Sequence, residues 1–155
     1  MLDGEACGLN VRGLPMFARA TRLEAAYRAT AYVIRQKPRD IIARVGKRSA
    51  EVDRLLGRLQ VHSAAFVTAW NPASAARSKV HNRAAHKRLL STTKRLRLMT
   101  VAGYGKGDDG EWPVEESLLV CGVDLTMARQ LGRQFGQNAI VWIRAGQRAK
   151  LVKLA

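Results

Sequence analysis

Seven short apolar runs of strand length, separated by turn residues or by helical segments, most constrain how this chain can fold. These runs are residues 27–34, 41–45, 64–70, 98–101, 117–123, 139–143 and 149–154. Three segments with the apolar spacing of a helix lie between them, at residues 50–59, 78–95 and 124–135. The order β-β-α-β-α-β-β-α-β-β predicts an α+β fold, with a mixed or mostly antiparallel sheet covered by about three helices.

Local signals support several of these boundaries. Ser49 and Asp124 are residues that cap helix starts, and Gly136 can take the left-handed conformation that ends a helix. Residues 103–110 are rich in glycine, but no helix follows them, as a phosphate-binding loop would require. We therefore expect residues 103–110 to form a flexible hairpin connection.

Length and composition predict one domain. The chain has 155 residues, of which 47% are apolar and 25% are charged, and these are values typical of a globular protein. Residues 1–22 show no sustained period and contain three glycines and a proline, so we expect a flexible tail there and an α+β domain over 23–155. Because no apolar run is long enough for a membrane span and no signal-peptide pattern is present, the default expectation is a soluble cytoplasmic protein.

The histidines and cysteines suggest no familiar catalytic or metal site. Cys7 lies in the expected tail and Cys121 in an apolar run, where it is expected to be a small buried hydrophobe. His81 and His86 are about 140° apart around a helix, so they do not form a metal pair on one face, and His62 stands apart. These patterns disfavour common hydrolases, leave catalysis uncertain, and predict neither a metal nor another cofactor.

The charge is large and arranged in blocks. The net charge is +15, no acidic residue lies between Asp53 and Asp108, and that interval holds eleven Lys or Arg residues. Residues 108–124 carry six acids and no Lys or Arg. A basic block can bind a polyanion by releasing counterions from phosphates, although arginine supplied by a GC-rich genome would also produce solvated basic surfaces.

The helix expected at 78–95 places its charges on one side. At 100° per residue, Ala85 and Leu89 face inward, and Asn82 lies beside them. Four cations fall together on another side and are the candidates for nucleic-acid contact: Lys79, Arg83, Lys87 and Lys94. Four later arginines could join them: Arg129, Arg133, Arg144 and Arg148.

Amide side chains occupy unusual positions next to strands. Gln137 and Asn138 lie between Gly136 and an apolar run, and Asn71 follows another run. Such side chains can converge on one cleft, which Asn82 could also face. The alternatives are that Asn82 is an interior residue satisfied by the loop after residue 72, and that the two later amides cap backbone groups at a helix end.

Four stretches in fixed order resemble an uncharacterised bacterial family, domain of unknown function 3293. They are residues 68–72 (Thr-Ala-Trp-Asn-Pro), Asn82, residues 112–117 and residues 135–139 (Phe-Gly-Gln-Asn-Ala). The resemblance extends from about residue 23 to the C-terminus and implies no activity. It does imply the signature positions Asn71, Asn82, Glu115, Gln137 and Asn138, with Glu116 as an alternative to Glu115.

Three functions from different classes remain. The first is a pocket that binds an unknown small ligand through these five polar side chains, where Glu115 could act as a base. The second is nucleic-acid binding through the basic helix. The third is an interaction module whose basic surface meets an acidic protein, which could be residues 108–124 of a second copy. The ordered motifs rank the pocket first and the basic surface second, while the oligomeric state stays open.

Overall fold

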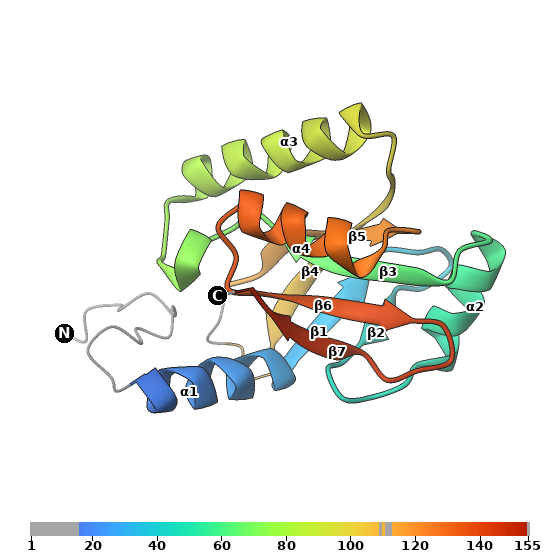
Figure 1. The fold of residues 1–155 in the computed structure, drawn as a ribbon, viewed down its shortest axis with the longest axis horizontal. Coiled ribbons are helices and arrows are strands. Elements are labelled where there is room, and N and C mark those ends of the chain that lie inside the picture. The colour runs from blue at the N-terminus through green and yellow to red at the C-terminus, as the bar shows by residue number, and fades with distance from the viewer. Residues whose placement is uncertain (1–15, 109, 111–112, 155) are drawn as a thin grey trace.

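The protein folds as one seven-stranded antiparallel sheet with helices packed on it (Figure 1). The computed structural model describes residues 16–108, 110 and 113–154. The elements in chain order are α1 (Met16–Arg28), β1 (Thr30–Ile34), β2 (Ile41–Ala43), α2 (Ala50–Arg58), β3 (Ser63–Thr68), the short 3-10 helix η1 (Pro72–Ser74), α3 (Lys79–Arg95), β4 (Met99–Gly107), β5 (Glu115–Cys121), α4 (Leu125–Gln134), β6 (Ala139–Arg144) and β7 (Lys150–Lys153). The α+β class predicted from the sequence is confirmed.

The sheet curls until its two edge strands approach each other. The strand order is β2-β1-β4-β5-β3-β6-β7, and every pair of neighbours is antiparallel. Just beyond β2, Val45 forms a parallel bridge with Ala149, and the Gly46 N–H donates to the Ala149 carbonyl at 2.8 Å. The curl brings the two edges of the sheet together. It gives the sheet an inner face and an outer face.

Each face of the sheet has its own apolar cluster. The inner cluster contains Tyr32, Phe66 and Leu119 and is covered by α2 through Val52 and Leu56. The outer cluster is built from alternate strand residues, with Ala85 and Leu89 of α3 and Ala128 and Leu131 of α4 packed on it. The two basic helices α3 and α4 therefore lie on the same outer face of the sheet (Figure 1).

Helix α1 is a fourth helix that the sequence did not predict. Residues 27 and 28 were expected to open a strand, but they end α1, and β1 starts at Thr30. Tyr27 favours a strand in isolation, yet here it packs against the inner cluster from the helix. The flexibility expected for residues 1–22 stays a prediction: residues 1–15 lie outside the described part, and residues 16–22 are helical.

Strand β4 corrects the expectation of a flexible glycine loop. Residues 103–107 are paired strand, with Gly103 opposite Ile34 on one side and Ser117 on the other. A Cβ atom at Gly103 would lie 2.8 Å from Cζ of Phe66 and would also collide with the backbone carbonyl of Val33. The glycine is needed because the Val33 carbonyl and the Phe66 ring approach the strand closely, not because the chain turns there.

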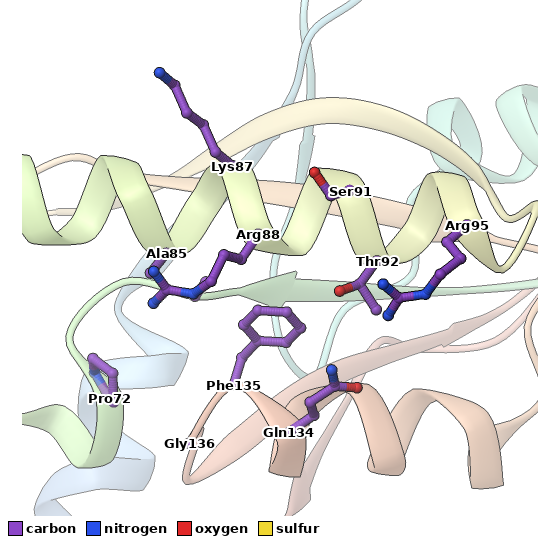
Figure 2. A pocket seen from close by; sticks show the side chains of 11 residues that line it. Pro72, Ala85, Lys87, Arg88, Ser91, Thr92, Arg95, Gln134, Phe135 and Gly136 are labelled. Carbon is purple, nitrogen blue, oxygen red and sulfur yellow. The ribbon is translucent and has the colours of Figure 1, made fainter.

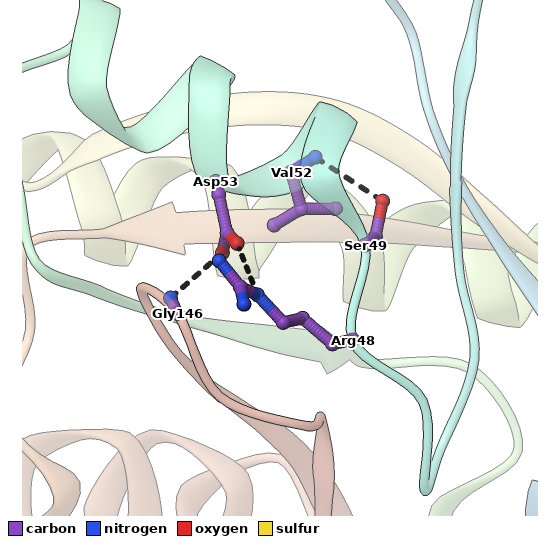
Figure 3. A network of polar contacts seen from close by, with 5 residues as sticks. All are labelled: Arg48, Ser49, Val52, Asp53 and Gly146. Atoms are coloured by element: carbon purple, nitrogen blue, oxygen red, sulfur yellow. Dashed lines mark hydrogen bonds and ion pairs between the residues drawn. The ribbon is translucent and has the colours of Figure 1, made fainter.

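A polar network fastens α2 to the turn between β6 and β7 (Figure 3). Ser49 caps α2 as predicted, accepting from the Val52 N–H at 3.2 Å. Asp53 accepts from the Gly146 N–H at 2.9 Å and from Nε of Arg48 at 2.9 Å. Burial acts to raise the pKa of Asp53, but these contacts outweigh it and lower the pKa. The network holds α2 beside the sheet edge near the Val45–Ala149 bridge.

Cys121 is a buried residue of the inner cluster, as predicted. Its side chain is 4% exposed, its Sγ contacts the Leu119 carbonyl, and burial raises the pKa of its thiol to about 11. Cys7 lies outside the described residues. No helix in the described part of the chain is long and apolar enough to cross a membrane.

Candidate functional site

The loop between β3 and α3 holds three residues in the left-handed conformation. Asn71 has φ 47°, Ala73 has φ 55° and Ser74 has φ 58°. For residues other than glycine this conformation costs about 1–2 kcal/mol each, so the surrounding contacts must hold the loop in place. The five candidate signature residues supply those contacts from two sides.

Asn71, Asn82 and Glu115 form the first set of contacts. The Asn71 N–H donates to Oδ1 of Asn82 at 3.0 Å, and Nδ2 of Asn82 donates back to Oδ1 of Asn71 at 2.9 Å. Nδ2 of Asn71 donates to Oε1 of Glu115 at 2.7 Å. Arg77 closes the loop, since its N–H binds Oδ1 of Asn71 and its carbonyl accepts from Nδ2 of Asn82. Asn82 is 2% exposed, which matches the interior alternative weighed for it.

Gln137 and Asn138 hold the loop from the other side. Nε2 of Gln137 donates to the Trp70 carbonyl at 3.2 Å and to the Phe135 carbonyl at 3.1 Å. Nδ2 of Asn138 donates to Oγ of Ser74 at 2.9 Å. The contacts of Gln137 match the alternative in which the amides cap backbone groups at a helix end, whereas Asn138 binds a side-chain hydroxyl of the loop. Each of the five candidates therefore forms a hydrogen bond with a residue of the segment 70–77 or, for Asn71, lies within that segment and bonds to Asn82 and Glu115.

Glu115 and Glu116 differ in their surroundings. Glu115 binds Asn71, and its carboxylate adds to the effect of burial in raising the pKa of Tyr27. Glu116, the next residue of β5, lies 3.9 Å from Nε2 of His86 on α3. Since neighbouring strand residues point to opposite faces, only Glu115 joins the Asn71 network.

A groove of about 630 Å³ lies between α3 and α4, beside this loop (Figure 2). Its lining residues are Ala69, Pro72, Ala85, Lys87, Arg88, Ser91, Thr92, Arg95, Gln134, Phe135 and Gly136. None of the five amide and carboxylate candidates lines it. The loop forms one end of the groove through Pro72, which is held near Gly136 by a 2.7 Å bond from the Ala73 N–H to the Gly136 carbonyl.

Arg88 and Arg95 are groove residues that the sequence analysis missed. In Figure 2 the Arg88 side chain extends toward the Pro72 end of the groove and the Arg95 side chain toward Gln134, whereas Lys87 points away. The available signal was their spacing, since residues 88, 92 and 95 recur along one helix face. The face with residues 88, 92 and 95 lies next to the face that carries the four predicted basic residues. It lines a groove only because α4 lies opposite.

The four predicted basic residues of α3 are all exposed. Lys79, Arg83, Lys87 and Lys94 lie on the outer side of the helix, and Arg88 and Arg95 are also exposed. Across the described residues, no ion pair includes any of these six cations. The acids Glu24, Glu51, Asp53 and Asp108 instead pair with cations elsewhere in the chain. Among the described residues, these six cations of α3 therefore face solvent without a bound carboxylate, and the acid recorded beside α3 is Glu116, next to His86.

The groove, the loop and α3 all lie within one segment of the chain that matches a known sequence family. Residues 67–140 match the family described as Protein of unknown function (DUF3293). The chain resembles DUF3293 over this segment, which is shorter than the range from residue 23 expected from the motifs. All groove residues and all five signature candidates fall inside the DUF3293 segment. Neither a curated protein nor a solved structure matches the chain.

Proposed function

We propose that this protein binds nucleic acid through the exposed basic side of α3 and the adjoining groove. The observation that carries the proposal is a group of six exposed cations on one 17-residue helix, without an ion pair among the described residues. A rigid helix holds such charges at fixed spacing, and a phosphate backbone neutralises them while releasing its counterions.

The uneven distribution of ion pairs favours this proposal over a purely compositional origin of the charge. If arginine were only spread over the surface by codon bias, acids would be expected to pair with it on every face. Most of the described ion pairs instead involve α1, α2 and residues near β2, as with Arg44 and Asp108 at 2.9 Å. The six cations of α3 are not paired with an acid among the described residues, and unpaired cations favour binding of a polyanion.

The contacts of the five signature residues support a ligand pocket less well than the exposed cations of α3 support nucleic-acid binding. Asn82 is almost fully buried, and its amide bonds are made to Asn71 and Arg77. Asn71 likewise binds Glu115 and Arg77. A ligand bound by these groups would have to replace hydrogen bonds that already hold a left-handed loop. We therefore rank the amide pocket behind the basic surface.

Fluorescence anisotropy tests the proposal with labelled DNA and RNA oligonucleotides at about 50 and 200 mM salt. The expected result is binding that weakens steeply with salt. The quadruple variant Lys79→Gln/Arg83→Gln/Lys87→Gln/Lys94→Gln should bind much more weakly, and its slope of log K against log salt should be smaller by up to about 4.

The matched control removes four exposed cations that were not candidates for nucleic-acid contact: Lys47→Gln/Arg54→Gln/Arg58→Gln/Lys150→Gln. This control changes the net charge equally but leaves α3 intact, so it should retain most of the affinity. Absence of binding by the wild type at low salt would refute the proposal. Equal losses in the two quadruple variants would also refute it, because they would reflect net charge alone.

A further inference from the structure

We infer that the groove between α3 and α4 holds a nucleotide of single-stranded nucleic acid, with its base against the Phe135 ring and its phosphates beside Arg88 and Arg95. This inference rests on the proposed function and specifies which form of nucleic acid is bound. It also assigns a role to Arg88, Arg95 and Phe135, none of which was a site candidate from the sequence.

The cationic wall of the groove is one stripe of α3. Arg88, Thr92 and Arg95 follow each other at spacings of four and three, so they lie along one side of the helix. The two arginines are about 10.5 Å apart along the helix axis at 1.5 Å per residue. In Figure 2 the Arg88 guanidinium lies on the Pro72 side of the Phe135 ring, the Arg95 guanidinium lies on the Gln134 side, and Oγ1 of Thr92 lies between them. Planar guanidinium groups suit phosphate oxygens, which they can bind through two parallel hydrogen bonds.

The opposite wall provides an aromatic surface. Phe135 is the C-cap of α4 and packs partly against the outer cluster, but it is only partly buried and its ring lies in the groove. Gly136 follows in the left-handed conformation and turns the chain away, which leaves the ring at the end of the helix. A base can stack on such a ring without regard to its sequence, because every base has a π face.

Charge and access favour a phosphate-bearing polymer in this groove. None of the lining residues is acidic, and three of them are Lys or Arg. Lys87, Arg88, Ser91, Arg95 and Gln134 are all exposed, so a chain could enter and leave the groove along its length. The volume of about 630 Å³ is within the range of small-molecule sites and can hold a nucleotide.

Single-stranded nucleic acid fits better than a duplex because the Phe135 ring requires the face of a base. In a duplex that face is covered by the neighbouring base pairs, so contact with the ring would require unstacking. A single strand can turn one base into the groove while its backbone follows the basic side of α3.

Substitution of Phe135 gives the first test, with single-stranded and duplex DNA of one sequence compared by anisotropy. Phe135→Leu keeps apolar volume against the outer cluster but removes the ring, and it should weaken single-strand binding about tenfold or more. Phe135→Tyr should bind as the wild type does. Duplex binding should change little in either variant, and circular dichroism and urea unfolding check that both remain folded.

Photo-crosslinking gives a second test, and its first observation is made on the wild type. An oligonucleotide containing 5-iodouracil should crosslink to the tryptic peptide of residues 134–144, which contains Phe135. Arg88→Gln/Arg95→Gln should lose this crosslink and single-strand affinity, while the control Arg54→Gln/Arg58→Gln should keep both.

The outcomes separate this inference from the proposed function. No binding of any nucleic acid by the wild type would overturn both. A second possible result is salt-sensitive binding that is equal for single strands and duplexes, is unchanged in Phe135→Leu, and gives crosslinks only outside residues 134–144. That result would leave the proposed function intact and overturn the inference about the groove. Equal weakening of single-strand and duplex binding by Phe135→Leu would also overturn it.

Discussion

Asn71 and Asn82 hydrogen-bond to each other in both directions, and this reciprocal pair joins the end of β3 to the first turns of α3. The Asn71 N–H reaches Oδ1 of Asn82 at 3.0 Å, and Nδ2 of Asn82 reaches Oδ1 of Asn71 at 2.9 Å. An amide can form such a pair because it carries both a donor and an acceptor. The pair fixes Asn71 in its left-handed conformation and thereby positions Pro72 at the end of the groove. The signature amides thus shape the groove without lining it.

Replacing Asn82 should destabilise the protein because its side chain holds the loop between β3 and α3. Asn82→Ala leaves the Asn71 N–H and the Arg77 carbonyl without their buried partners, and we expect a loss of about 2–3 kcal/mol in the free energy of unfolding. Urea unfolding measures this loss. The control Gln130→Ala changes an exposed residue of α4 and should stay within about 0.5 kcal/mol of the wild type. A similar value for both variants would show that the reciprocal pair contributes nothing.

His86 should make the stability fall between about pH 7 and pH 5. Burial lowers the pKa of His86 more than the nearby Glu116 raises it, and Nδ1 of His86 is a buried atom without a hydrogen-bond partner in the described structure. Because the folded pKa lies below the unfolded one, the unfolded chain binds more protons in this range. The stability is therefore fully present above the unfolded pKa and is lost as the pH falls toward the folded pKa.

The variant His86→Leu should lower the stability difference between pH 7 and pH 5, as measured by urea unfolding at both values. His81→Gln is the matched control, since it removes an exposed histidine from the same helix. An undiminished difference in His86→Leu would assign the pH dependence to other groups.

The same glycine-to-alanine change should have opposite effects in two helices. In α4, a Cβ at Gly132 would collide with Leu154 and would lie 2.7 Å from Cγ2 of Ile140, so Gly132→Ala should destabilise by about 1–3 kcal/mol. In α2, no described atom outside the adjacent residues and the helix backbone lies within 4 Å of a Cβ at Gly57, so Gly57→Ala should stabilise by about 0.5–1 kcal/mol. Thermal unfolding of both variants measures the two signs, and stabilisation by Gly132→Ala would contradict the packing of α4 against β6 and residue 154.

The sequence by itself determined the features that depend on neighbours in the chain. Ser49 and Asp124 cap their helices as predicted, through bonds to N–H groups three residues later. Gly136 takes the left-handed conformation predicted for it, and Asn82 points inward as its position on the helix requires. Each of these features depends on backbone geometry within one or two helical turns. The spacing of residues in the sequence is therefore enough to predict it.

The tertiary structure alone decided the features that need a partner far away in sequence. Gly103 belongs to a strand because it pairs with Ile34 of β1 and Ser117 of β5. Tyr27 lies in the last turn of α1, where it packs against the inner cluster. Arg88 and Arg95 became groove residues only when Phe135 of α4 was placed opposite α3 on the outer face. Their spacing was visible in the sequence, but what they face depends on how the curled sheet brings the two helices together.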